Sequence, residues 1–277
     1  MKNYFGNTIY TDDFMWNEMK IYELPKYLYH YTSLETVALI LKNMTLRFNR
    51  LDKVNDLNEA SSYNLPHANT LVFASSWTEH SKESIPMWRL YTRDMDGVRI
   101  KLPINMFKGR SSPNVFEKGG ATLSLEEAIL INREGLNYNI NTRMIQGPNK
   151  IYYSDEEKLL RSNVIMNYDD NVKVSLYDLG MFKQKCWEYE QEWRFKLLGF
   201  THESHLPNDS FTKDILNLEK YPIKNTFIDV PLEPSVFNEA EFTIGPKSTE
   251  AHFLLLESLI EKYSPHATIN RSSLQLR

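Results

Sequence analysis

The stretch Trp187-Glu188-Tyr189-Glu190-Gln191-Glu192-Trp193-Arg194-Phe195 interleaves aromatic and charged side chains more densely than any other part of the chain. Successive side chains of a β-strand point to opposite faces, so this alternation predicts a strand. One face of that strand would carry the aromatic residues. The other face would carry Glu190, Glu192 and Arg194.

The two carboxylates Glu190 and Glu192 stand two positions apart, which on a strand places them roughly 7 Å apart on one face. Two acids so placed can divide the work of catalysis, since one can hold a substrate hydroxyl while the other orients the nucleophile. The alternative is a solvated strand face with a Glu–Arg ladder, because charged side chains usually lie in water. The surrounding aromatic residues favour the catalytic interpretation, because removing a carboxylate from water shifts its pKa and suits it to catalysis.

Working outward, the remaining pattern predicts strands and helices that interleave without strict βαβ regularity. This favours one α+β domain over residues 25–277, preceded by an N-terminal arm over residues 1–24. Thr32 and Glu35 have the spacing of a capping box, which predicts a helix that runs to about Asn43. Further strands are expected at 27–31, 45–49, 71–77, 97–102, 150–153, 225–230, 241–244 and 267–270. Further helices are expected at 86–91, 125–132, 155–166, 174–185 and 248–263.

Composition excludes several classes of protein. The 277 residues include 32 Lys and Arg against 36 Asp and Glu, a formal net charge of −4. This excludes a uniformly basic nucleic-acid coat but not a local basic groove. The single cysteine, Cys186, excludes an internal disulfide and any metal site built from several cysteines. Only ten glycines are present, and none forms a Rossmann or P-loop motif.

The chain shows no secretory leader and no long apolar run, so we expect a soluble, cytoplasmic protein without a membrane segment. We also expect no metal site, because His, Asp and Glu do not cluster at ligand spacing.

Other polar residues are open to two interpretations. His30 follows an apolar strand and precedes a helix N-terminus, where it could contact an anionic or hydroxylated ligand. The alternative is a core or capping histidine. Asn55 and Asp56, with Glu59, form either a polar site or a turn cap. The aromatic residues Trp88 and Tyr91 belong either to the core or to an aromatic box.

Six motifs follow one another in order. They are Tyr29-His30-Tyr31-Thr32-Ser33 before a helix; Asn55-Asp56-x-x-Glu59; Phe73-Ala74-Ser75-Ser76; Met87-Trp88-x-x-Tyr91 before Gly97-Val98-x-Ile100; Trp187-x-Tyr189-Glu190-x-Glu192-Trp193-Arg194; and Ile244-Gly245-Pro246. In this order they resemble an uncharacterised prokaryotic family that is grouped with the ADP-ribosyltransferase-like superfamily. The resemblance covers about residues 27–275. It implies two small, mainly antiparallel sheets that form a cleft, with flanking helices.

The resemblance also implies roles for particular residues. Glu192 would be the catalytic acid, Glu190 would orient the acceptor, and His30 would occupy the first-strand position. Tyr91 is the candidate for the middle position, with Ser75 or Ser76 as alternatives. The residues implied to bind NAD are His30, Tyr31, Thr32, Arg47, Asn49, Asn55, Asp56, Ser75, Trp88 and Arg194.

The implied activity is transfer of ADP-ribose from NAD, the co-substrate, to a protein or nucleic acid, as in a bacterial toxin or phage-defence effector with a neutralising partner protein. A carboxylate on the ribose can stabilise the oxocarbenium-like state without a metal. Aromatic rings can stack on nicotinamide, and Arg47 could neutralise the pyrophosphate. An NAD glycohydrolase and a non-catalytic nucleotide-sensing or protein-binding module remain alternatives.

Overall fold

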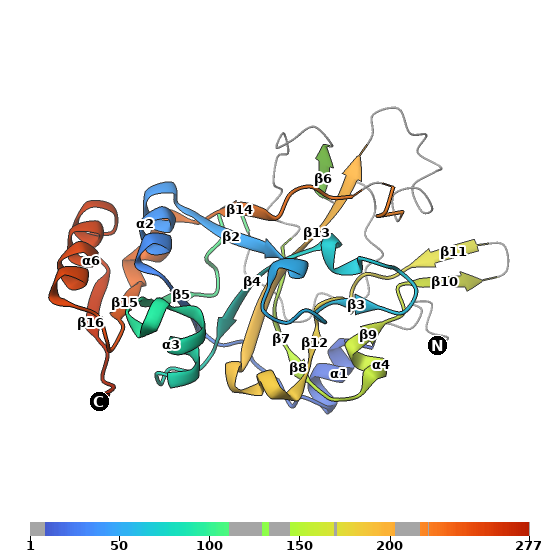
Figure 1. Ribbon diagram of the computed structural model, residues 1–277, viewed down its shortest axis with the longest axis horizontal. Helices are drawn as coiled ribbons and strands as arrows, with labels where there is room; N and C mark the ends of the chain where they lie inside the picture. Colours follow the sequence, from blue (N-terminus) through green and yellow to red (C-terminus); the bar gives the residue numbers. More distant parts are fainter. Residues whose placement is uncertain are drawn as a thin grey trace.

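The computed structural model describes residues 9–110, 129–132, 145–168, 171–202, 217–220 and 222–276. Within these residues, ten strands form one sheet with helices packed on it, an α+β architecture (Figure 1). The strands are β1 (Tyr27–Thr32), β2 (Thr45–Arg50), β4 (Val72–Thr78), β5 (Val98–Pro103), β6 (Ile129–Asn132), β7 (Gln146–Lys150), β13 (Glu192–His202), β14 (Phe227–Pro231), β15 (Glu241–Ile244) and β16 (Thr268–Arg271). Pairing in this sheet is antiparallel except between β13 and β6 and between β15 and β16.

The sheet divides into two halves at β4. β13 pairs with every residue of β4 and so occupies one of the two edges of β4. Two strands share the other edge of β4. β2 pairs with Phe73 and Ala74 of β4, and β1 pairs with β4 only through Tyr29 and Thr78. The two sheets expected from the sequence are therefore halves of one sheet, β14-β2-β4-β13 with β6 and β7, and β1-β5-β15-β16, joined by one residue pair.

Three two-stranded sheets complete the described strands. They are β10 (Ile165–Tyr168) with β11 (Asn171–Val174), β12 (Phe182–Lys183) with β8 (Tyr152–Tyr153), and β3 (Ser61–Ser62) with β9 (Arg161–Ser162). The first pair is antiparallel and the other two are parallel. Of these strands, β12 brings Lys183 beside Glu192 at the start of β13.

One face of the large sheet builds the main hydrophobic core. Trp77 of β4 and Trp193 and Phe195 of β13 are buried there. Helices α2 (Leu34–Asn43) and α6 (Glu250–Tyr263) pack side by side, and their buried aliphatic residues join the same core (Figure 1).

Two smaller apolar clusters hold other elements in place. On the face opposite the main core, Tyr31 packs edge-on against Trp88 of helix α3 (Ile85–Tyr91), with ring centroids 4.9 Å apart. Part of the expected N-terminal arm forms helix α1 (Asp12–Asn17), and Tyr10 beside it packs against Phe182. Every helix among the described residues is too short or too polar to cross a lipid bilayer.

Helix starts follow local capping, with two corrections. Ser33, not Thr32, caps α2, because Thr32 is the last residue of β1 and the Ser33 hydroxyl accepts from the Thr36 amide at 3.2 Å. The helix expected to start at Ser248 starts at Glu250, and Thr249 caps it in the same way. The helix start predicted at Pro86 is confirmed to within one residue, and Ser84 caps α3.

Three predicted helices are wrong over much of their length. Residues 129–132 form β6, while 125–128 lie outside the described residues. In place of the 155–166 helix there is one turn, α4 (Glu157–Leu160), followed by β9 and the start of β10. The 174–185 stretch contains the end of β11, turns and β12. Short apolar runs suit a helix or a strand equally, and strand pairing decided between them.

Candidate active site

Glu190 and Glu192 are not neighbours on one strand face, as their spacing predicted. The segment Lys185–Glu190 forms 3-10 turns, and Gln191 adopts a left-handed conformation with φ of 44° before β13 begins. This reversal folds both carboxylates onto one ammonium group. The Nζ of Lys183 lies 2.6 Å from Oε2 of Glu190 and 3.3 Å from Oε2 of Glu192.

The same acids belong to a larger ion-pair network. Arg194 lies 2.6 Å from Oε1 of Glu192, donates to the Gly180 carbonyl at 2.6 Å and contacts Glu59. We call the five residues Glu59, Lys183, Glu190, Glu192 and Arg194 the carboxylate cluster. Their side chains are at most 6 % exposed, so the alternative of a solvated Glu–Arg ladder is wrong.

The cluster holds its two central carboxyl groups in different protonation states. Burial raises the pKa of Glu190 to about 7, and the charge of Glu192 adds to this rise. Burial would also raise the pKa of Glu192, but Arg194, Lys183 and a hydrogen bond from Ser76 outweigh it and lower that pKa to about 2. Near neutral pH, Glu192 is therefore a fixed negative charge and Glu190 can gain or lose a proton.

Two tyrosines complete the surroundings of these acids. The Tyr91 hydroxyl, at the end of α3, donates to Oε1 of Glu190, and burial together with the charge of Glu190 raises the pKa of Tyr91. The Tyr153 hydroxyl accepts from the Glu192 amide at 2.9 Å. A group with a pKa near 7 beside a neutral hydroxyl can act in proton transfer, and a fixed carboxylate can stabilise a developing positive charge.

The cluster reaches the protein surface beside Ser76. This serine lies opposite Arg194 in the β4–β13 register, is exposed, and hydrogen-bonds to Glu192. Ser75 faces the opposite side of β4, where its hydroxyl accepts from Trp77 Nε1 at 2.9 Å. Of the two serines considered for the middle position, only Ser76 contacts the cluster.

Aromatic residues lie beside the same acids. The Tyr189 side chain is 36 % exposed, and its ring centroid is 6.2 Å from that of Trp187. The Lys183 ammonium lies 4.7 Å from the centre of the Trp187 ring.

The structure does not bring the His30 side chain to the carboxylate cluster. The register Tyr29–Thr78–Glu192 places Tyr29 on the face of Glu192, so His30 belongs to the other face. There the His30 ring lies 5.1 Å from Trp77, and Nδ1 is 2.9 Å from the Ser76 carbonyl. Burial lowers the pKa of His30, so at neutral pH the ring is uncharged and Nδ1–H donates to that carbonyl.

Several predicted NAD-binding residues have other partners. Arg47 makes a bidentate ion pair with Asp229, at 2.8 and 3.0 Å, on the exposed side of β2, beside the exposed Asn49. Trp88 is buried and donates Nε1 to Glu83 at 3.0 Å. The Tyr31 hydroxyl accepts from the Ser84 amide at 3.1 Å.

The Asn55–Glu59 segment is a turn, and the turn aims one acid into the cluster. Asn55 is exposed, and Asp56 accepts from the Asn58 amide at 3.0 Å, the turn-capping alternative. Glu59 follows, buried, with its carboxylate against Arg194. Thr32 is a buried strand end without a side-chain contact to the cluster in the described structure.

Three cluster contacts escaped the sequence analysis. Glu59 was part of a quoted motif without a role, and Lys183 was placed in a helix that does not form. Tyr153 stood at the end of an expected strand and was given no role. Among the described residues, no group of His, Cys, Asp and Glu is arranged to hold a metal ion, because Lys183 and Arg194 occupy the carboxylates.

Comparison with known proteins adds one finding. A family model described as a protein of unknown function (DUF2971) matches residues 87–195. The matched stretch is less than half of the chain; it contains Tyr91, Lys183, Glu190, Glu192 and Arg194 but not Glu59. No curated protein and no solved structure matches the chain.

Proposed function

We propose that this protein is an ADP-ribosyltransferase that consumes NAD and modifies a macromolecule, either a protein or a nucleic acid. The observation that carries this proposal is the unlike pair Glu190 and Glu192, which share Lys183 while one titrates near neutrality and the other stays ionised. The order of sequence motifs and the sheet divided at β4 support the same assignment.

In this proposal the two acids have separate tasks. Glu192 would hold a ribose hydroxyl of NAD and stabilise the positive charge that develops as nicotinamide leaves. Glu190 would accept the proton of the incoming acceptor group, which needs a base with a pKa near the working pH. Tyr91 would position Glu190 through their hydrogen bond. His30 would act through the Ser76 backbone, since its ring lies on the other face of the sheet.

A second candidate is a non-catalytic nucleotide-sensing or protein-binding module. Burial favours it, because Arg194 and Lys183 already occupy the oxygens of Glu192 and little of the carboxylate is exposed. In this alternative the ion pairs of the cluster stabilise the packing of β12, β13 and the Glu59 turn, and they catalyse no reaction. Hydrolysis of NAD by the same residues would differ from transfer only in the acceptor, which would be water.

The test uses purified protein, NAD labelled in the ADP-ribose part, and a cell lysate. The proposal expects label in protein or nucleic acid, and label confined to free ADP-ribose would indicate a glycohydrolase. Glu192→Gln should slow nicotinamide release about 10²–10³-fold, because the charge matters most as the bond breaks. The matched control is Glu188→Gln, which changes an exposed acid of the same segment and should leave the rate unchanged. No consumption of NAD, or a wild-type rate in Glu192→Gln, would contradict the proposal.

The cellular setting belongs to the same proposal. An enzyme that modifies a macromolecule at the expense of NAD would suit a toxin or phage-defence effector in the cytoplasm, held in check by a neutralising partner protein. Mass spectrometry of the labelled acceptor would identify the target class.

A further inference from the structure

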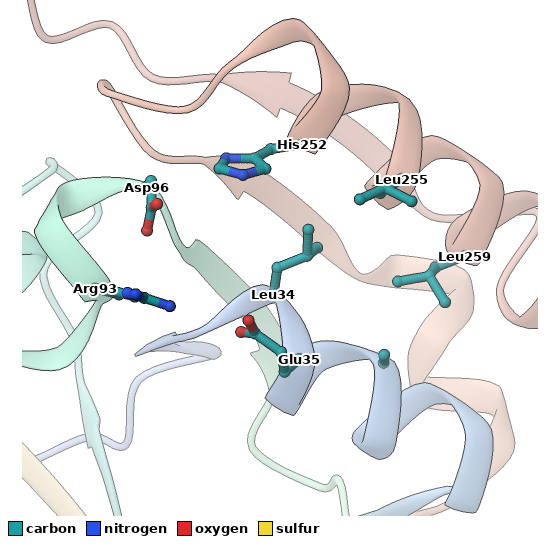
Figure 2. A pocket seen from close by; sticks show the side chains of 8 residues that line it. Leu34, Glu35, Arg93, Asp96, His252, Leu255 and Leu259 are labelled. Atoms are coloured by element: carbon teal, nitrogen blue, oxygen red, sulfur yellow. The ribbon is translucent and has the colours of Figure 1, made fainter.

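A cavity lies away from the carboxylate cluster, between α2, α6 and the turn η3 (Arg93–Met95) (Figure 2). Its volume is about 410 Å³, which falls within the roughly 300–1,000 Å³ range of small-molecule sites. None of the residues proposed for NAD chemistry lines it, so any ligand here has its own role.

One end of this cavity is apolar. Leu34 of α2 lies across it from Leu255 and Leu259 of α6 (Figure 2), and Ala38 also lines it. Leu255 is 56 % exposed, so its side chain is accessible to a ligand in the cavity. An apolar group bound between the two helices would cover this leucine and gain the corresponding hydrophobic free energy.

The other end carries both signs of charge. Glu35, Arg93, Asp96 and His252 meet there, and Arg93 points toward Glu35 (Figure 2). Within the described residues, no ion pair joins any two of these four side chains. Nδ1 of His252 is buried without a hydrogen-bond partner. Hydrogen bonds from the Glu35 amide and from Ser33 lower the pKa of Glu35, so its carboxylate is ionised.

The polar end is held in place by the turn that leads into α6. The Lys247 amide donates to the Met95 carbonyl at 3.2 Å, and the Ser248 hydroxyl donates to the Asp96 carbonyl at 2.8 Å. A Cβ at Gly245 would come within 2.3 Å of the Met95 carbonyl oxygen, so this close approach requires glycine. The backbone that carries Arg93 and Asp96 is therefore fixed before any ligand arrives.

We propose that this cavity binds a zwitterion with a large apolar group, the chemistry of a free α-amino acid with a hydrophobic side chain. The ammonium group would face Glu35 and Asp96, and the carboxylate would face Arg93. The apolar side chain would enter the space between Leu34 and Leu255. A ligand with only one charge could pair with the carboxylates or with the guanidinium of the polar end, but not with both.

The experiment is calorimetric titration of the full chain with three compounds that share one ring. L-Phenylalanine has both charges, 2-phenylethylamine lacks the carboxylate, and 3-phenylpropionate lacks the amine. L-Phenylalanine should bind at least about tenfold more tightly than either, since a polar site rejects an analogue that lacks a charged partner. Equal affinities for the three compounds, or no binding of L-phenylalanine at millimolar concentration, would overturn the proposal.

Variants assign each end of the ligand. Arg93→Gln should remove the advantage of L-phenylalanine over 2-phenylethylamine. Glu35→Gln should reduce its advantage over 3-phenylpropionate, because Asp96 still faces the ammonium group. Leu255→Asp should weaken all three compounds, and its exposed position makes the change compatible with folding. Arg89→Gln, an exposed arginine of α3 outside the cavity, is the control and should change nothing. Tight binding that survives Arg93→Gln and Glu35→Gln unchanged would place the ligand elsewhere and refute the assignment.

Discussion

Glu190→Gln should remove a pH dependence from the folding of this protein. The pKa of Glu190 rises from an ordinary 4.5 to about 7 on folding, chiefly because the carboxyl is buried. The folded chain therefore holds this proton more tightly than the unfolded chain. The stabilisation is fully present below pH 4.5 and is lost as the pH rises through about 7. With these two pKa values, the linkage relation gives a loss of about 2.5 kcal/mol between pH 5 and pH 8.

Glutamine imitates the uncharged, protonated carboxyl at every pH. Its oxygen can accept from Lys183, and its NH2 group can donate to the Tyr91 hydroxyl. The assay is urea unfolding of wild type and Glu190→Gln at pH 5, 6, 7 and 8. The difference between their free energies of unfolding should move by about 2.5 kcal/mol in favour of the variant as the pH rises. His30 and Lys196 also have shifted pKa values, but they are common to both proteins and cancel in the difference.

Glu188→Gln is the matched control, because this exposed acid precedes Glu190 by two residues. Its difference from wild type should stay flat over the same pH range. A flat difference for Glu190→Gln as well would refute the reasoning, because it would mean that the buried carboxyl does not titrate near neutrality.

Two further changes test the buried charges. Arg194→Met should lower the free energy of unfolding by about 3–5 kcal/mol, because Glu59 and Glu192 would lose the guanidinium that they share. Adding Glu59→Gln to this variant should recover part of the lost free energy, as measured by urea unfolding. A loss below about 1 kcal/mol for Arg194→Met alone would contradict the prediction. Lys196 is buried, which lowers its pKa to about 7, so the folded chain binds fewer protons than the unfolded chain above that pH. The stability of wild type relative to Lys196→Met should therefore rise by about 2 kcal/mol from pH 7 to pH 9, and a constant difference would show that Lys196 keeps its ordinary pKa.

Local pattern predicted much of the sheet. The strands at 27–31, 45–49, 71–77 and 97–102 were found to within about a residue or two, because alternation of apolar and polar side chains is itself the signal of a half-buried strand. The failures lie at 125–132, 155–166 and 174–185, where short apolar runs fit two periods equally. Strand partners that come from elsewhere in the chain decided those segments, as when β12 pairs with β8.

The sequence by itself determined which residues could carry chemistry beside β13. Glu190, Glu192 and Tyr91 were singled out because acids among aromatic residues are visible in the order of the chain. Only the tertiary structure decided their partners. Lys183 comes from β12, a strand that the sequence pattern had predicted as helix. Glu59 comes from a turn more than a hundred residues away in the chain, and no local pattern records such a contact.

The tertiary structure also decided which side of the sheet each candidate faces. His30 and Glu192 were expected together, but which face His30 takes depends on the single pair Tyr29–Thr78 that joins the two halves. A shift of one residue in that register would reverse the face of every side chain on β1. The chain thus encodes its strands through local period, while packing across β4 sets the register and, with it, the composition of the site.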